Sequence, residues 1–418
     1  MATGLTSARW THVALPTGDL DKSIAFYTAL TPLVVVERFK DADGESVWLS
    51  NDQQAETPFV LVLVSFNKDK GNQLGLLHPF AHLGIEVSQL CLGSMMFGAW
   101  GNTDEAECHR MVATALDAGV NFVDTADVYA FGESEEIVGR ALKGRRDEVV
   151  LVSKVASRMP AGPLDRNRGG ASRLWITRAV EDSLRRLGTD HLDVYLVHRP
   201  DPLTDVEETL GVLSDLVRAG KVRAIGTSSF PAEEIVEAQW AARRGGTERF
   251  TVEQLSYSVL ARHAEAAALP TAERHRMGVM VWSPLNGGWL TGKYRAGVGP
   301  AADSRALRNS DHFDFADEQV RTRKLAVVEE LVRLAADEGC TLVELALRFV
   351  LAHPGVTSAV MGARTHDQLL SQLTAVDRPL SAEALDRIDA LVAPGSVLNP
   401  LDTGYTPPAL ESAALRRR

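Results

Sequence analysis

The feature that most constrains the fold is a regular alternation of amphipathic helices and apolar strands between residues 104 and 374. The predicted helices cover 104–118, 134–142, 173–187, 205–219, 233–243, 264–276, 342–352 and 366–374. The predicted strands cover 121–126, 149–155, 192–198, 222–228, 251–257, 279–283 and 358–361. Glycine closes several helices, as it commonly does. With an apolar strand near 85–93, eight strand–helix units predict a parallel α/β (β/α)8 barrel.

Reactive side chains stand where three consecutive predicted strands end. Asp124 ends NFVD, Lys154 ends VVLVSK and His198 ends DVYLVH, while Tyr129 follows shortly after Asp124 in FVDTADVY. A lone lysine at such a place is usually solvated, and a lone tyrosine or histidine usually packs in a core. In this barrel fold, however, the active site lies at the carboxyl ends of the strands. Four such residues at one end of three strands therefore predict a catalytic site.

From about residue 87 to residue 395 the sequence resembles the aldo-keto reductase family. IEVSQLCLGSMMFG is similar to that family's first barrel strand, and FVDTADVY, VVLVSK and DVYLVH match its catalytic tetrad. NRGGASRLWITRAVEDSLRRLGTD resembles the bacterial branch that is related to potassium-channel β subunits. The resemblance implies a TIM barrel and an NADP-dependent oxidoreductase.

The matched tetrad implies reduction of an aldehyde or ketone to an alcohol by hydride transfer. The alkoxide that forms needs a proton, and Tyr129 is expected to be the general acid. An unperturbed tyrosine has a pKa of about 10. Lys154 is therefore expected to lower the pKa of Tyr129, and Asp124 to hold Lys154 in place and charged. His198 is expected to donate a hydrogen bond that orients the carbonyl.

Further segments resemble the nicotinamide-binding parts of the same family and imply NADPH (NADP+) as the cofactor. Ser228 and Ser229 in IGTSSF, and Gln254 in VEQLSY, are expected to hold the carboxamide, and Trp282 is expected to stack on the nicotinamide. Ser229 stands where the family usually has asparagine. No GxGxxG motif follows a predicted strand, so a Rossmann domain is not supported.

The phosphates and the adenine are assigned to two other segments. The glycine-rich run after Trp282 reads as a plain loop when taken alone, but the resemblance assigns it to the pyrophosphate. Arg364 is expected to bind the adenosine 2′-phosphate, which favours NADPH over NADH, and Gln372 stands where asparagine is usual. The full predicted cofactor site is Gly93, Met95, Ser228, Ser229, Gln254, Trp282, Ser283, Leu285, Gly287, Lys293, Gly362, Arg364, Gln368 and Gln372.

The first eighty-odd residues predict a small α+β module with the order β-α-β-β-β, followed by a strand over 80–87. HVALPTGDLDKSIAFYTAL and FAHLGIEV resemble the vicinal oxygen chelate, or glyoxalase/dioxygenase, superfamily, of which this would be a partial module. His12 and His82 fall where metal ligands would lie. They read either as ordinary strand residues or as half of a site shared across a dimer. The predicted metal site is accordingly none.

The predicted organisation is a fusion of this module (1–86) with the barrel (87–395) and a C-terminal tail (396–418), with the usual hairpin under the barrel partly replaced. The net charge of −11 argues against nucleic acid or an anionic membrane as a partner. Three scattered cysteines and the absence of a secretory signal predict a cytoplasmic protein. The expected partner is a small-molecule carbonyl substrate, and a homo-oligomer stays open.

Two long polar connections, 157–172 and 294–317, are expected to shape the substrate pocket. The sequence leaves two alternatives to the reductase. One is a redox-sensing module that holds NADPH with little turnover. The other is a bifunctional protein whose N-terminal module binds a metal or a small molecule.

Overall fold

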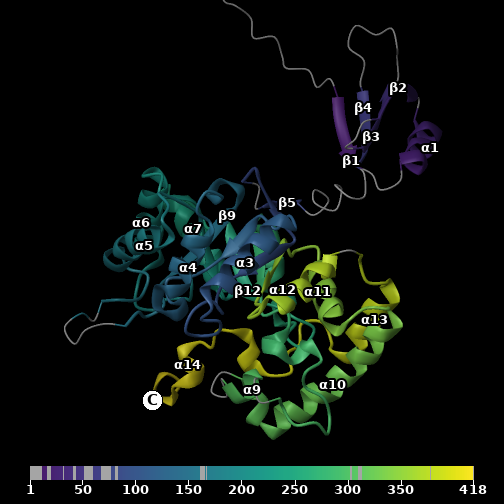
Figure 1. Cartoon of the computed structure of the whole chain (residues 1–418). Coiled ribbons are helices and arrows are strands. Elements are labelled where there is room, and N and C mark those ends of the chain that lie inside the picture. The colour runs from purple at the N-terminus through teal and green to yellow at the C-terminus, as the bar shows by residue number, and fades with distance from the viewer. Residues whose placement is uncertain are drawn as a thin grey trace, which may run out of the picture. The chain divides into compact units, whose positions relative to one another are not determined.

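The computed structural model describes residues 12–16, 20–31, 33–40, 44–50, 60–66, 77–80, 83–160, 165, 167–301, 304–308, 313–376 and 378–417. The chain divides into two compact units, Met1–Leu76 and Leu77–Arg418, which Figure 1 shows from purple at the N-terminus to yellow at the C-terminus. None of the described helices is long and apolar enough to cross a membrane.

The first unit is a four-stranded sheet with one helix. Its elements are β1 (His12–Pro16), α1 (Leu20–Leu30), β2 (Val34–Lys40), β3 (Gly44–Ser50) and β4 (Val60–Phe66). The sheet order is β1-β4-β3-β2, with β1 parallel to β4 and the other pairs antiparallel. The predicted order β-α-β-β-β is confirmed. Leu20 and Leu33 pack with Val47 and Leu49 in a small core, because α1 and β3 turn their apolar sides toward each other.

Of the two histidines that resemble metal ligands, the structure describes only one. His12 begins β1, whereas His82 lies outside the described residues. Across the described ranges, no group of three or more His, Cys, Asp or Glu side chains is arranged to hold a metal ion.

The second unit begins with a hairpin where the sequence predicted a single strand over 80–87. β5 (Leu77–Phe80) and β6 (Ile85–Ser88) pair antiparallel, and Gly84 takes a φ of 68° between them, a conformation that glycine adopts without strain. Phe80 and Val87 are fully buried against apolar side chains that point into the barrel, including Phe122 at the start of β8. The hairpin therefore closes the N-terminal end of the barrel and is not partly replaced.

The barrel itself is closed and entirely parallel, which confirms the predicted (β/α)8 fold. Its strands are β7 (Leu90–Gly93), β8 (Phe122–Asp124), β9 (Val150–Val155), β10 (Leu192–Val197), β11 (Val222–Ser228), β12 (Val252–Ser256), β13 (Gly278–Trp282) and β14 (Ser358–Met361). They close in the order β10-β11-β12-β13-β14-β7-β8-β9. Each predicted strand is present, because runs of Val, Leu and Ile that are buried on both faces are typical of parallel strands.

Helices surround the strands, as Figure 1 shows. They are α3 (Glu105–Asp117), α4 (Glu133–Ala141), α5 (Arg173–Leu187), α6 (Val206–Arg218), α7 (Ala232–Gly245), α8 (Ala268–Arg274), α11 (Leu342–Ala352) and α12 (His366–Leu373). Polar caps fix several of their ends: Ser172 accepts a hydrogen bond from the N–H of Trp175, and Thr341 and Glu344 form a capping box.

Two further helices and a returning segment were not predicted. α10 (Glu318–Asp337) and α13 (Ala382–Leu391) lie outside the repeating units, and the chain then continues through the short turn η8 (Pro400–Thr403). Lys324 of α10 is fully buried and pairs with Asp314 (2.6 Å) and Asp402 (2.8 Å). The part of the tail around 399–404 is therefore held against the barrel unit.

Candidate active site

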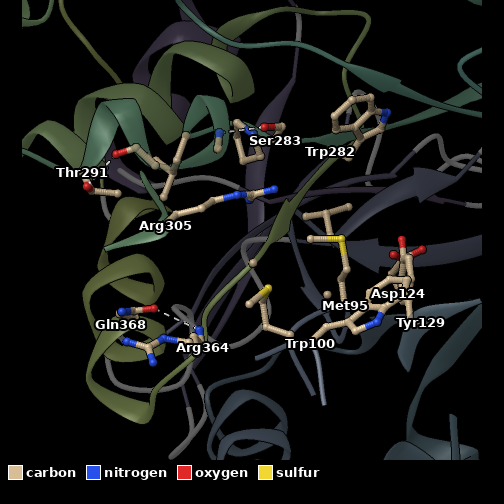
Figure 2. Close-up of a pocket in the computed structure, with 18 of the residues that line it drawn as sticks. Met95, Trp100, Asp124, Tyr129, Trp282, Ser283, Thr291, Arg305, Arg364 and Gln368 are labelled. Atoms are coloured by element: carbon tan, nitrogen blue, oxygen red, sulfur yellow. Dashed lines mark hydrogen bonds between the residues drawn. The ribbon is translucent and has the colours of Figure 1, made fainter. Parts of the chain in front are cut away.

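A cavity of about 540 Å³ opens at the carboxyl ends of the barrel strands. Asp124, Tyr129, Met95 and Trp100 lie together at one side in Figure 2, with Trp282 above them, while Arg305, Arg364 and Gln368 lie at the other side. All the predicted site residues line this cavity except Lys154 and Ser229, which lie just behind it. The strand ends thus bring the two predicted sets of residues to one cavity.

Lys154 connects the predicted catalytic residues at the base of the cavity. It extends from β9, it is fully buried, and its Nζ donates to Asp124 Oδ2 (2.7 Å), to the carbonyl of Thr125 (2.8 Å) and to the hydroxyl of Tyr129 (3.0 Å). Burial opposes the charge on Lys154, but Asp124 and Tyr129 outweigh it and the pKa of Lys154 is raised. The lysine is therefore a fixed cation directly behind the phenol.

Tyr129 begins the short turn η1 (Tyr129–Gly132), which β8 reaches through residues 125–128. Burial raises the pKa of Tyr129, and the opposing effect of Lys154 does not reverse that direction. This corrects the expectation that Lys154 brings the pKa of Tyr129 below its usual value. The buried phenol keeps its proton at neutral pH, and the cation behind it stabilises the phenolate only when that proton is transferred.

His198 follows β10 and lies beside Tyr129, with ring centroids 5.7 Å apart. Its pKa is lowered well below the usual range because the ring is buried and because Lys154 and Arg199 are cations nearby. The imidazole is therefore neutral, with one nitrogen as donor and the other as acceptor. Nδ1 lies 3.2 Å from Ser157 Oγ. When Ser157 donates to Nδ1, Nε2 carries the hydrogen and can donate to a carbonyl oxygen.

Gln254 binds the second carboxylate oxygen of Asp124. Its Nε2 donates to Asp124 Oδ1 (2.8 Å), so both carboxylate oxygens of Asp124 are bound, one by Gln254 and one by Lys154. The sequence had assigned Gln254 to the carboxamide of the cofactor. Gln254 does line the cavity, but its described hydrogen bond fixes Asp124.

Ser229 orients the predicted stacking residue from behind. Its hydroxyl oxygen accepts from Trp282 Nε1 (3.3 Å) and from Arg199 Nη1 (3.2 Å), and Ser228 next to it lines the cavity. Glu253 fixes this turn because its carboxylate accepts from the N–H of Phe230 (3.2 Å) and from the hydroxyl of Thr227.

The glycine-rich segment after β13 forms η4 (Asn286–Thr291) and contributes to the cavity wall. Ser283 Oγ accepts from the N–H of Gly287 (2.9 Å), which shapes the turn. Leu285 and Lys293 also line the cavity. On the far side, Gly362 and Arg364 follow β14, and Gln368 accepts from the N–H of Arg364 (3.0 Å) at the start of α12.

Three buried side-chain polar atoms of lining residues have no hydrogen-bond partner within the described residues. They are Oγ of Ser304, Nε of Arg305 and Oε1 of Gln372. Unsatisfied buried polar atoms are rare in folded proteins, and a water molecule, an ion or a bound ligand can supply the missing partner. With Lys293, Arg308 and Arg364 also lining the cavity, the residues present fit a dinucleotide that carries several phosphates.

Several lining residues were not found from the sequence. Trp100 comes from the loop after β7, Arg305 and Arg308 from the connection after β13, and Arg199 directly follows His198. Arginines in a polar loop give no signal of their own. Arg199 also gave no signal, because the sequence does not show whether the side chain of a residue just after a strand points into the cavity.

Residues 89–393 match the family model described as the Aldo/keto reductase family. Aldo-keto reductase YhdN of Bacillus subtilis is 39% identical over 301 residues, which cover 70% of this chain and 87% of that protein. A probable voltage-gated potassium channel subunit beta of Oryza sativa is 36% identical over 74% of this chain and 94% of its own length. The uncharacterized oxidoreductase YrpG of B. subtilis is 36% identical over 75% and 94%.

Proposed function

The chain belongs to the aldo/keto reductase family, and on that premise we propose that it reduces an aldehyde or ketone to the alcohol with NADPH. The observation that carries this proposal is the set of contacts at Lys154. One buried ammonium touches both Asp124 and the hydroxyl of Tyr129, and the neutral ring of His198 lies next to that hydroxyl. The arrangement can deliver a proton to one oxygen atom in the cavity.

When bound, NADPH supplies the hydride that the carbonyl carbon accepts. The carbonyl oxygen lies between the hydroxyl of Tyr129 and Nε2 of His198, where His198 donates a hydrogen bond and polarises the bond. Tyr129 gives its proton to that oxygen as negative charge develops, and the O–H bond of the alcohol forms while the phenolic O–H bond breaks. Lys154 then faces the phenolate at hydrogen-bond distance. Asp124 keeps Lys154 charged throughout.

The lining residues suggest how the cofactor would be held. Trp282 would face the nicotinamide and Ser228 its carboxamide. Lys293 and Arg305 would bind the pyrophosphate, and Arg364 the 2′-phosphate. The adenine would lie near Gln368 and Gln372, as the resemblance implies. The unpartnered Oε1 of Gln372 and Nε of Arg305 support this assignment.

Tyr129→Phe tests the mechanism. We expect NADPH oxidation with a generic aldehyde to fall by at least about 100-fold, the size of a lost general acid. The dissociation constant for NADPH, measured by fluorescence titration, should stay within about threefold because the ring and Lys154 remain. Tyr27→Phe in the first unit is the matched control and should leave both quantities unchanged. Full activity in Tyr129→Phe would contradict the mechanism, and parallel assays with NADH check the choice of cofactor.

A second candidate function is a redox-sensing module that holds NADPH and turns over slowly. Two relatives named as potassium channel β subunits favour this function, because their alignments with this chain cover 94% of each relative's length. Rapid-quench measurements distinguish the two functions. One hydride transfer per bound cofactor without release would favour the sensor, whereas continuous turnover favours the reductase.

A further inference from the structure

The positive charges of the cavity fall into two groups. Lys293, Arg305, Arg308 and Arg364 come from the connection after β13 and from the turn after β14, where the phosphates of a dinucleotide are expected. Arg199 stands apart from them, directly after His198 at the end of β10. Among the described lining residues Asp124 is the only carboxylate, and Lys154 and Gln254 already bind its two oxygens. The catalytic side of the cavity thus carries a cation that Asp124 does not neutralise.

Within the described residues, Arg199 donates hydrogen bonds to neutral oxygens only, and its guanidinium also lies 5.7 Å from the centroid of the Trp282 ring. Its Nη1 donates to the carbonyl of His198 (2.8 Å) and to the hydroxyls of Ser229 (3.2 Å) and Ser228 (3.5 Å). In the described part of the chain, these bonds all come from Nη1, and no carboxylate forms an ion pair with the guanidinium. Its Nε and Nη2 N–H groups can therefore pair with an anion in the cavity.

The buried acid Glu253 does not supply Arg199 with a negative charge. Glu253 influences Arg199 electrostatically, but its carboxylate is already bound by Thr227 and by the N–H of Phe230. Burial raises the pKa of Glu253 to about 8, so the group is largely protonated at neutral pH. Tyr129 also faces the guanidinium and keeps its proton, while His198 is neutral and Lys154 is a second cation.

We propose that Arg199 binds a carboxylate of the substrate, so that the protein prefers aldehydes or ketones that carry a carboxylate over neutral carbonyl compounds. This inference rests on the proposed reductase function and names its substrate class. A guanidinium presents a planar pair of donors that matches the two oxygens of a carboxylate. Because Arg199 and His198 both line the cavity and interact electrostatically, an anion bound by Arg199 lies close to the carbonyl that His198 orients. The bound carboxylate also offsets the cost of holding an unpaired cation in a half-buried place.

The test compares each carboxylate substrate with its methyl ester, which lacks the charge and carries one extra methyl group. 4-Carboxybenzaldehyde is paired with its methyl ester, and succinic semialdehyde with its methyl ester. We expect wild-type kcat/KM to be about 10- to 100-fold higher for each acid than for its ester, as for a hydrogen bond to a charged group. The difference should lie mainly in KM, since Arg199 contacts the substrate away from the reacting carbon.

Arg199→Gln and Arg199→Lys identify the residue responsible. In Arg199→Gln the preference for the acid over its ester should collapse to about threefold or less. A change in NADPH affinity or in kcat that follows from the lost bonds to Ser228 and Ser229 affects acid and ester alike and cancels in that ratio. Arg199→Lys should keep part of the preference, because it retains the charge but loses the planar pair of donors. Arg218→Gln, on the exposed surface of α6, is the control for net charge and should behave as the wild type.

A binding measurement separates this inference from the proposed function. 4-(Hydroxymethyl)benzoate should bind to the wild-type protein saturated with NADP+ in a calorimetric titration, and at least about tenfold more weakly to Arg199→Gln. If the wild type reduces none of the four substrates but binds this anion through Arg199, the anion site stands and the proposed function fails. If the esters are reduced as well as the acids, or Arg199→Gln lowers activity on acids and esters equally, the inference is overturned while the reductase stands.

Discussion

At the scale of single residues, the site depends on buried charges whose partners are fully specified. Lys154 has three oxygen acceptors, and Asp124 has a donor on each carboxylate oxygen. An isolated buried charge costs several kcal/mol, whereas a pair with complete hydrogen bonding is tolerated. The same burial that fixes Lys154 raises the pKa of Tyr129. The proton is therefore present on the phenol before the substrate arrives.

The buried side chain of Glu253 makes the stability of the folded protein depend on pH. Its folded-state pKa of about 8 lies above the ordinary 4.5, so between these values the folded protein keeps a proton that the unfolded chain loses. Stability must then fall as pH rises through this interval, and the loss levels off above pH 8. Glu253→Gln does not titrate. From pH 5.5 to 8.5 its free energy of unfolding should gain about 3 kcal/mol relative to the wild type.

Denaturant unfolding at several pH values measures this difference. Glu383→Gln, on the exposed surface of α13, is the control and should keep a constant difference from the wild type. A difference between Glu253→Gln and wild type that does not change with pH would show that Glu253 is ionised throughout the folded state.

At the scale of elements, the sequence was enough to predict those site residues that stand at the ends of apolar strands. Asp124, Lys154 and His198 were found because each follows a continuous apolar strand, and the ends of parallel strands meet at one face. The hairpin β5–β6 was misread as one strand, because Phe80 and Val87 are both apolar and the turn between them depends on one left-handed glycine.

Features that depend on contacts between distant segments could not be predicted. Lys324 forms its ion pairs only when folding brings Asp314 and Asp402 to it, and the spacing of the three residues along the chain does not predict these contacts. Likewise, Gln254 is bonded to Asp124 across the barrel. The net direction of the Tyr129 pKa depends on its depth of burial, which only the packed structure provides.

The returning segment at 399–404 gives a prediction for the cavity wall. Gly404 has a φ of 83°, and a Cβ added there would overlap the indole of Trp282. Gly404→Ala should therefore displace that indole and weaken NADPH binding by about tenfold or more, in addition to about 1 kcal/mol of backbone strain. Fluorescence titration with NADPH measures the loss.

Gly297→Ala is the matched control for Gly404→Ala. Gly297 has a similar φ of 75°, but no atom lies within 4 Å of its added Cβ. It should show the strain in unfolding experiments without the loss of NADPH affinity. Equal affinities in the two variants would mean that Gly404 does not position Trp282.

At the scale of the whole molecule, the second unit contains every part that its barrel needs. Its own hairpin supplies Phe80 and Val87 to the N-terminal end of the barrel, and its strands close without a gap. The first unit has a separate small core. The described contacts therefore make the barrel complete without the first unit.

A chain shortened to residues 77–418 should keep its thermal transition within a few degrees of the barrel transition of the full chain, and its NADPH-dependent turnover within about threefold. A chain shortened further to residues 89–418 also lacks β5 and β6. It should be less stable by several kcal/mol, because apolar side chains at the end of the barrel lose their cover. Circular dichroism and activity assays check both chains. Inactivity of the first would show that the first unit completes the site.

The ion pairs of Lys324 with Asp314 and Asp402 also have a consequence for when the cavity wall can form during synthesis. Asp124 and Lys154 leave the ribosome long before Asp402 and Gly404, so the barrel strands can associate while one wall of the cavity is still missing. Until Asp402 arrives, Lys324 lacks one of its two carboxylates and Trp282 lacks its neighbour. A nascent chain at this stage therefore lacks part of the proposed cofactor site. On the proposed function, we expect capture of NADPH to be a late event, which follows the emergence of residue 404.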